Sequence, residues 1–360
     1  MLRPFTQENV RAQGRVTAVT WLPPAVWAVC YHGNWASGNS RRMLESCIFN
    51  IISRRVESQM SKLKFLISLM TSENDYQVEQ ANAAEAVAGK LGIDCQVLFA
   101  DNDAVTQSSQ ILKAIQSPEG KQLSGVIMEP VGGTALPQVA RAATNAGVGW
   151  VVLNREVNYM SELRRTAKVP AFGVSSDHLE VGRIQARQCA ALIPRGGTVL
   201  YVQGPSDSPV AKDRVEGMQE LKPGNIQLLT LKGNWTEESA ARAGRSWLSL
   251  MTSRKTVIDA VIAQNDAMAI GVRKAFQEMI PEMDKDRWLD IPFTGVDGAP
   301  KTGQAWVRSG LLAATVHTPP NAGTALEVFV SAIERGKTPE ERVLIEPSSV
   351  PTLEQLKSRR

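Results

Sequence analysis

From about residue 62 onward, the sequence alternates between short apolar runs and longer amphipathic stretches. Each apolar run is short enough for a buried strand, and each longer stretch has apolar residues at helical spacing. Strands in turn with helices, joined by short loops, predict parallel sheets covered by helices on both faces. The strands expected are 64–70, 95–100, 125–130, 150–155, 172–174, 198–204, 226–231, 259–264, 291–298, 311–316 and 343–346.

The chain has 360 residues, more than one hydrophobic core usually holds. The alternation occurs twice without a low-complexity linker, so we expect the α/β class with two doubly wound, Rossmann-like lobes. Local signals mark several helix ends: Gly92 as a C-cap, with Asp103 and Asp177 as N-caps. The segment 156–170 is expected to be a loop. The later helices are expected at 209–221, 236–250, 266–280 and 320–335.

Residues 1–59 differ from the rest, with no sustained period and a double proline at Pro23-Pro24. The apolar run Val16–Cys30 follows two arginines, as in a signal peptide, but the prolines interrupt it and no clean cleavage site follows. Our preferred interpretation is that Met60 is the true start and that residues 1–60 are an N-terminal extension, disordered or not part of the fold. The alternative is an atypical export or anchoring segment.

Charge is placed unevenly along the chain. The net charge is +4, and residues 1–60 hold seven Arg against three Glu, so the remaining 300 residues are neutral. This neutrality argues against a nucleic-acid surface on the main body, and no helix-turn-helix pattern precedes the first strand. Cys95 and Cys189 lie in apolar periodic segments and are expected to be small core residues.

Polar residues directly follow several of the predicted strands: Glu129, Asn154-Arg155, Asn265-Asp266 and Asp297. Because parallel strands end at one edge of the sheet, these side chains should converge in one crevice, where open α/β sheets bind ligands. Arginine and amide groups there can bind a hydroxylated ligand. The alternatives are a surface ion pair for Arg155 and helix caps for Asp266 and Asp297.

Three further residues have two interpretations each. Arg214 lies in the helix that Ser208-Pro209 opens, where a lone arginine is more often a solvated charge. Trp235 and Tyr76 lie in loops before helices, where an aromatic residue is either a hydrophobic staple or a face on which a sugar ring stacks.

Motifs for catalysis and for cofactor binding are absent from the sequence. It contains no GxGxxG, GxxxxGK[ST] or GxSxG, and the three histidines, His32, His178 and His317, are scattered. We therefore expect neither an enzyme, nor a metal site, nor a cofactor.

Residues 62–350 resemble the type I periplasmic binding proteins, in particular the ribose-binding-like sugar group. The matching segments are VVLNRE, GPSDSPVAKDRVEGM, DAVIAQNDAMAIGV, FTGVDGAP and GLLAATVHTPP. The resemblance implies a three-segment hinge, with crossings near Ser175, Thr318 and Glu346. Lobe 1 would then be 62–175 plus 319–346, and lobe 2 would be 176–318 plus 347–360.

The resemblance also implies a ligand-binding set that departs from the family pattern. Asn154 stands where the family usually has Asp, Glu129 where ribose binders have Asn, and Thr318 where they have Gln, and the first loop carries a lone Tyr instead of paired Phe. Sugar binding is therefore expected, but not ribose in particular. The implied ligand-binding residues are Tyr76, Glu129, Asn154, Arg155, Arg214, Trp235, Asn265, Asp297 and Thr318.

Together these features predict a monomeric solute-binding protein that traps a small polyhydroxylated ligand, such as a monosaccharide, by hinge closure. By resemblance it would be periplasmic and would deliver the ligand to the membrane subunits of an ABC transporter or to a receptor, without binding nucleic acid. One alternative is a cytosolic or receptor-coupled sensor of the same fold, since no clean export signal is visible. Another is an enzyme on a doubly wound sheet.

Overall fold

The computed structural model describes residues 63–358, apart from 74, 119–121, 133–135 and 251–255. The described residues all belong to one compact unit, Gln59–Arg360. The predictions for residues 1–60 lie outside the described residues.

The first sheet has six parallel strands in the order β11-β5-β4-β3-β1-β2, and we call it and its helices lobe 1. Its strands are β1 (Lys64–Leu69), β2 (Asp94–Phe99), β3 (Leu123–Met128), β4 (Gly149–Leu153), β5 (Ala171–Ser176) and β11 (Arg342–Ile345). Its helices are α3 (Asp75–Leu91), α4 (Ala104–Gln116), α5 (Pro137–Asn145), α6 (Met160–Thr166) and α14 (Asn321–Arg335).

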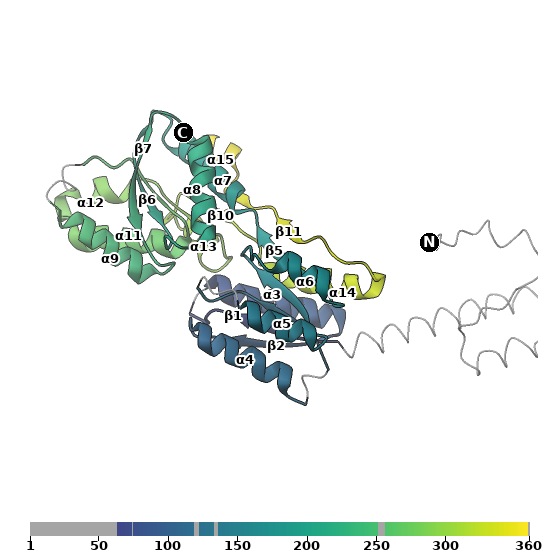
Figure 1. The fold of residues 1–360 in the computed structure, drawn as a ribbon. Coiled ribbons are helices and arrows are strands. Elements are labelled where there is room, and N and C mark those ends of the chain that lie inside the picture. The colour runs from purple at the N-terminus through teal and green to yellow at the C-terminus, as the bar shows by residue number, and fades with distance from the viewer. Residues whose placement is uncertain (1–62, 74, 119–121, 133–135, 251–255, 359–360) are drawn as a thin grey trace, which may run out of the picture. The chain divides into compact units, whose positions relative to one another are not determined.

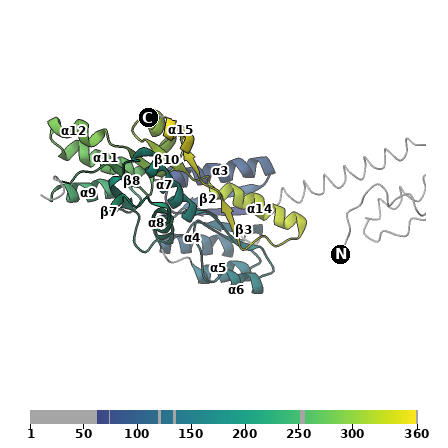
Figure 2. The same cartoon turned by 90° about the horizontal axis from the view of Figure 1, so that it is seen from above.

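Side chains that alternate along the strands of lobe 1 build a core on each face of its sheet. In β1, Phe65 and Ile67 pack in the same cluster as residues of α14, whereas Leu66 packs with residues of α4 and α5. This is the period of two that a strand imposes on its side chains. The late helix α14 lies beside the early helix α3, as both views show (Figure 1 and Figure 2).

The second sheet has the order β12-β10-β9-β8-β6-β7, and we call it and its helices lobe 2. All its pairs are parallel except β10 with β12. Its strands are β6 (Gly197–Gln203), β7 (Ile226–Lys232), β8 (Ala260–Ala263), β9 (Phe293–Asp297), β10 (Ala314–His317) and β12 (Ser348–Val350). Its helices are α7 (His178–Leu192), α8 (Pro209–Leu221), α9 (Glu237–Leu248), α11 (Asp266–Met279), α12 (Glu282–Leu289), α13 (Gly303–Arg308) and α15 (Leu353–Ser358).

The predicted fold class is confirmed: the chain forms two doubly wound α/β sheets with helices on both faces. The chain passes between the sheets three times, after β5, between β10 and α14, and between β11 and β12. The lobe boundaries given above, 62–175 plus 319–346 and 176–318 plus 347–360, stay a prediction.

Several local predictions are confirmed. Asp103 and Asp177 cap α4 and α7 with their side chains, and Gly92 has a φ of 65° after the end of α3. Cys189 is fully buried, as expected of a core residue, whereas Cys95 is only half-buried because it lies on the edge strand β2.

Other local predictions are wrong. The segment 156–170 is not all loop, because α6 forms within it and buries Met160 and Leu163. The strand expected at 311–316 is shorter and later, at Ala314–His317, and 343–346 does not close the fold, since β12 and α15 follow. Among the described residues, no helix is both long and apolar enough to cross a membrane.

Candidate functional site

Each sheet reverses its strand order beside its first strand. In lobe 1, β1 lies between β2 and β3, and in lobe 2, β6 lies between β7 and β8. Ligands of open α/β sheets bind outside the carboxyl ends of the strands at such switch points. Glu129 follows β3, and Asn265 follows β8, so the predicted polar residues lie at these two places.

Two adjoining cavities lie at these strand ends. The large cavity has a volume of about 560 Å³, within the range of small-molecule sites, and the small cavity about 80 Å³. A wider groove of about 860 Å³ runs along α4, away from the strand ends. The two adjoining cavities share Met70, Tyr76, Arg155, Ser208, Trp235, Asn265 and Asp297. The small cavity is also lined by Gln77, Glu129, Asn154, His178, Val210 and Arg214.

On lobe 1 the cavity wall is a hydrogen-bonded network. Gln77 Nε2 donates to Glu129 Oε2 at 2.9 Å, and Asn154 Nδ2 donates to the Tyr76 hydroxyl at 3.2 Å. Asn321, the first residue of α14, donates its amide to Asn154 Oδ1. Burial raises the pKa of the Glu129 carboxyl, while the hydrogen bond from Gln77 and the charge of Arg155 oppose that rise. These bonds hold both Glu129 and Asn154 in place before any ligand arrives.

Arg155 lies at the same wall and is partly exposed. It forms no ion pair among the residues that the structure describes, so the interpretation as a surface ion-pair partner is not supported. Burial lowers the pKa of its guanidinium, and the charges of Glu129 and Asp207 oppose that change.

On lobe 2, Arg214 is buried rather than solvated, so the interpretation as a surface charge is wrong. It is 4% exposed, its guanidinium donates to the carbonyl oxygen of Gln264, and it stacks on the Trp235 ring at 5.6 Å. Gln264 is itself fixed, since its Oε1 accepts from the Gly204 backbone N–H at 2.8 Å. Burial lowers the pKa of Arg214, and Asp297 partly offsets this.

Asn265 and Asp266 have different roles at the start of α11: Asn265 caps the helix, and Asp266 bonds to neighbouring segments. Asn265, not Asp266, is the N-cap: its Oδ1 accepts from Met268 N at 2.9 Å, and its Nδ2 donates to the Trp235 carbonyl at 2.8 Å. One N–H and one lone pair of the Asn265 amide are left over for a ligand. Asp266 is buried, where it accepts from Gly298 N and from Thr315 Oγ1, so its carboxylate holds the neighbouring loop and strand.

Asp297 ends β9 and does not cap the next helix, since the residue before α13 is Thr302. Burial, together with the charges of Glu129 and Asp75, raises the pKa of its carboxyl to about 7, although Arg214 opposes the rise. Its side chain lines both cavities. An acidic group in that position accepts hydrogen bonds once it is ionised.

Three of the predicted site residues have an uncommon backbone conformation. The φ angles of Asn154, Trp235 and Asp297 are 57°, 63° and 102°. Such conformations cost on the order of 1–3 kcal/mol each in residues other than glycine and gather at functional sites. The Trp235 ring covers Gly204 so closely that a Cβ there would lie 2.3 Å from the ring.

The structure brings eight of the nine predicted residues to the small cavity and leaves out Thr318. Thr318 is buried behind Asp297, whose carbonyl oxygen accepts from its N–H at 3.1 Å. The sequence predicts Tyr76 in a loop before a helix, but Tyr76 lies in the first turn of α3. Burial, and next the charge of Glu129, raise the pKa of the Tyr76 hydroxyl.

Sequence reasoning missed several residues of the cavity walls. Gln77 and His178 both line the small cavity, and Asp207 and Trp306 line the large one. His178 follows β5 with only Asp177 between them, so the strand-end signal applied to it as well. Because Asp177 was interpreted as a helix cap, the adjacent His178 was not considered as a site residue. Among the described residues, no group of three or more His, Cys, Asp or Glu could hold a metal ion.

Two proteins with similar sequences are named after the compounds that they bind. A putative rhizopine-binding protein of Rhizobium meliloti is 29% identical over 209 residues, which cover 56% of this chain and 64% of that protein, slightly less than two thirds of its length. The ribose import binding protein RbsB of Salmonella typhimurium is 24% identical over 257 residues, covering 71% of this chain and 79% of that protein.

Solved structures of solute-binding proteins share this fold. The myo-inositol binding protein of Caulobacter, solved with myo-inositol bound, superposes with a TM-score of 0.67 at 23% identity, covering 82% of this chain and 95% of that one. Residues 65–338 match the family described as periplasmic binding protein domain. That match spans most of the chain and includes all strands but β11 and β12, apart from Lys64 at the start of β1. The protein therefore belongs to the periplasmic binding protein family.

Proposed function

We propose that this protein is a non-enzymatic solute-binding protein that captures a small polyhydroxylated ligand, a monosaccharide or a polyol, in the adjoining cavities. The observation that carries the proposal is the balanced polar lining of the small cavity: Arg155 and Arg214 face Glu129 and Asp297. Two cations against two carboxyl groups suit a neutral ligand whose hydroxyl groups both donate and accept. Tyr76 and Trp235 supply aromatic faces for the ligand's C–H surface.

In this proposal the ligand-binding residues are those expected from the sequence, with Thr318 acting through Asp297 and not by contact. The lobes, 62–175 plus 319–346 and 176–318 plus 347–360, close about the three crossings. Closure is favoured because only the closed form lets one ligand use Arg155 of lobe 1 together with Arg214 and Asp297 of lobe 2. A ligand that lacks one hydroxyl leaves a buried group unpaired, at about 1–3 kcal/mol.

A transport role is supported by the names of the relatives, among them a ribose import binding protein and a D-xylose-binding periplasmic protein. We propose that the protein works as a monomer in the periplasm and delivers its ligand to the membrane subunits of an ABC transporter. Fractionation of the native host cell tests the location. Recovery from the cytoplasm alone would instead support a sensor of the same fold.

A thermal-shift screen of the full chain tests the binding function. The panel contains D-ribose, D-xylose, D-allose, xylitol and myo-inositol, with amino acids as the contrasting set. A ligand at 100 times its dissociation constant adds about 2.7 kcal/mol to the free energy of unfolding, which raises the melting temperature by about 4 °C. A shift with amino acids alone, or with no sugar or polyol, would contradict the proposal.

A further inference from the structure

His178 is a buried histidine whose side chain lines the small cavity. It is 4% exposed, and neither ring nitrogen has a hydrogen-bond partner among the described residues. His317, by comparison, has Nδ1 at 3.1 Å from the carbonyl oxygen of Gly298. A buried polar group without a partner costs about 1–3 kcal/mol, and a ligand in the cavity that His178 lines is a candidate to supply that partner.

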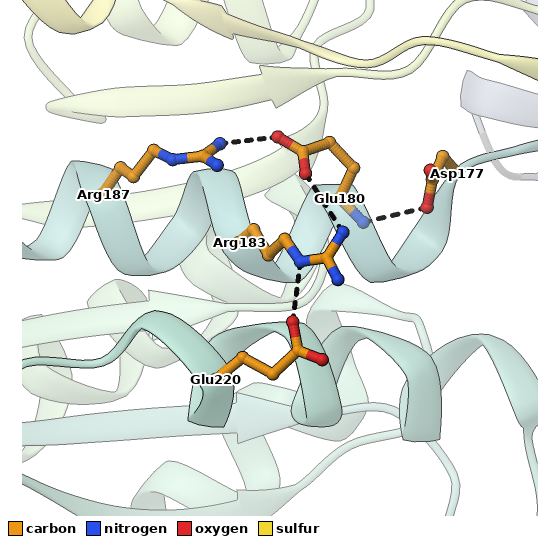
Figure 3. Close-up of polar contacts among 5 residues, drawn as sticks. All are labelled: Asp177, Glu180, Arg183, Arg187 and Glu220. Atoms are coloured by element: carbon orange, nitrogen blue, oxygen red, sulfur yellow. Dashed lines mark hydrogen bonds and ion pairs between the residues drawn. The ribbon is translucent and has the colours of Figure 1, made fainter.

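The position of His178 is fixed by the cap and by an ion pair of the helix that it begins. His178 is the first residue of α7, and its neighbour Asp177 caps the helix by accepting from Glu180 N at 2.9 Å (Figure 3). On the outer face of α7, Arg183 Nε donates to Glu220 Oε2 of α8 at 2.7 Å (Figure 3). The cap and this ion pair anchor the first turns of α7 away from the cavity, so the ring at position 178 has a defined place.

Two glycines bring α7 against α8 and so set His178 beside Arg214. A Cβ at Gly182 would lie 2.2 Å from the carbonyl oxygen of Arg214, and a Cβ at Gly217 would lie 1.9 Å from that of Leu179. Only glycine permits this backbone contact. The close crossing places the start of α7 and the arginine of α8 on the same wall of the cavity.

The imidazole of His178 stays neutral in this position. Burial, and then the positive charges of Arg214, Arg342 and Arg155, lower its pKa well below the ordinary value. A neutral imidazole offers one N–H donor and one acceptor nitrogen. Arg155 and Arg214 only donate, so His178 differs from both in what it can bind.

We propose that His178 contacts the bound ligand directly and selects for hydroxyl groups, donating to one hydroxyl oxygen and accepting from another hydroxyl. A hydroxyl group suits both ring nitrogens, whereas a ligand ammonium suits only the acceptor nitrogen and a carboxylate only the N–H. His178 is then a further specificity-determining residue, at the start of lobe 2. It rests on the proposed function, because it requires a polyhydroxylated ligand in the adjoining cavities that reaches into the small one.

Titration calorimetry of the full chain tests this contact with D-ribose, D-xylose, D-allose, xylitol and myo-inositol as probes. The variants are His178→Leu, which removes both polar atoms, and His178→Gln, which keeps one donor and one acceptor. Glu180→Gln is the matched control on the outer face of the same helix turn. For the probe that binds the wild type, His178→Leu should weaken binding about tenfold or more. His178→Gln should retain most of the affinity, and Glu180→Gln should not change it.

Monodeoxy analogues of the bound probe separate contact from structure. One analogue should bind the wild type more weakly than the bound probe does. His178→Leu should bind that analogue and the probe equally, because the partner of the missing hydroxyl is already gone. The melting temperature of unliganded His178→Leu should be unchanged or higher, since an unpartnered buried group has been removed. If the wild type binds a probe and His178→Leu binds it equally well, the contact is wrong while the function stands. If the wild type binds none of the five, the proposed function fails and the contact with it.

Discussion

The two walls of the cavity differ in how far their polar groups are already paired. On lobe 1, Gln77 donates to Glu129, and Asn154 is bonded to both Tyr76 and Asn321. On lobe 2, the buried side-chain atoms without a partner among the described lining residues are Arg214 Nε and the two ring nitrogens of His178. One wall is therefore arranged in advance, and the other is completed by whatever enters the cavity.

This difference implies a division of work between the lobes. A prearranged wall binds a ligand without further ordering cost. A wall with unpaired groups gains most when the ligand supplies their partners, so its affinity is coupled to closure. Replacing the buried, bonded Arg214 of lobe 2 should then change affinity and stability together, whereas replacing the partly exposed Arg155 of lobe 1 should change affinity alone.

The largest expected effect is a loss of stability when the contact between α7 and α8, which positions the lobe 2 wall, is disrupted. Gly217→Ala would force a Cβ to within 1.9 Å of the Leu179 carbonyl oxygen and separate α7 from α8. We expect the free energy of unfolding to fall by about 2–3 kcal/mol, measured by urea denaturation. The control is Gly89→Ala in α3 of lobe 1, where nothing lies within 4 Å of the added Cβ. That change should be neutral or stabilise by up to about 1 kcal/mol.

The second effect compares the two arginines. Arg155→Ala should weaken ligand binding by about 2 kcal/mol, roughly 30-fold, because it removes a charge-assisted hydrogen bond, yet leave the unliganded melting temperature unchanged. Arg214→Ala should weaken binding similarly and also lower the melting temperature, because Arg214 is buried, stacked on Trp235 and bonded to Gln264. Calorimetry and thermal unfolding measure the two quantities. Equal melting temperatures for both variants would remove the distinction between the walls.

A third effect concerns pH and Asp297, whose pKa in the unliganded cavity is about 7. Ligand hydroxyls donate to the ionised carboxylate, so affinity should rise with pH up to about 7 and then level off, by at most about tenfold per pH unit. Asp297→Asn should flatten this dependence, and what remains would report Glu129, whose pKa is also raised. Calorimetry between pH 5 and pH 8 gives the profile.

The same raised pKa has the opposite effect on unliganded stability. Between the ordinary pKa of 3.8 and about 7, the folded protein holds a proton on Asp297 that the unfolded chain has lost. The contribution of Asp297 to stability is therefore greatest at low pH and decreases as the pH rises through this window. A profile that does not change in Asp297→Asn would contradict the assignment.

The smallest effect tests the prearranged wall. Glu129→Gln keeps an oxygen that can accept from Gln77 Nε2 and removes a buried charge. We expect the free energy of unfolding to change by less than about 1 kcal/mol, and binding to weaken by at most about tenfold. Urea denaturation and calorimetry with the bound probe measure both. A severe loss of stability would show that the lobe 1 network depends on the charge of Glu129.

The fold was predictable from the sequence because its signals are local and repeated. Apolar runs such as Val261–Ala263, followed by a capping residue and a helical period, fix a parallel strand and its helix without distant information. The helix α6 was missed because its apolar residues, Met160 and Leu163, make one short turn of contact. Such a helix depends on packing and not on its own period.

The site was predictable where residues follow strands, and unpredictable where the position depends on how elements pack. Glu129 and Asn154 follow their strands directly and Asp297 ends its strand, so all three lie at strand ends. Arg214 looked like a surface charge because nothing near it in the sequence reveals that its side chain is buried against Trp235 and Gln264. Thr318 was placed at the site by resemblance, but the structure sets it behind Asp297.

The most direct test of the account is a crystal structure of the full chain with the panel member that gives the largest thermal shift. We predict one ligand in the adjoining cavities, in contact with Arg155 of lobe 1 and with Arg214 and Asp297 of lobe 2. Its oxygen atoms should lie about 2.7–3.2 Å from these side chains. A ligand bound elsewhere, for example in the groove along α4, or touching one lobe alone, would contradict the central claim.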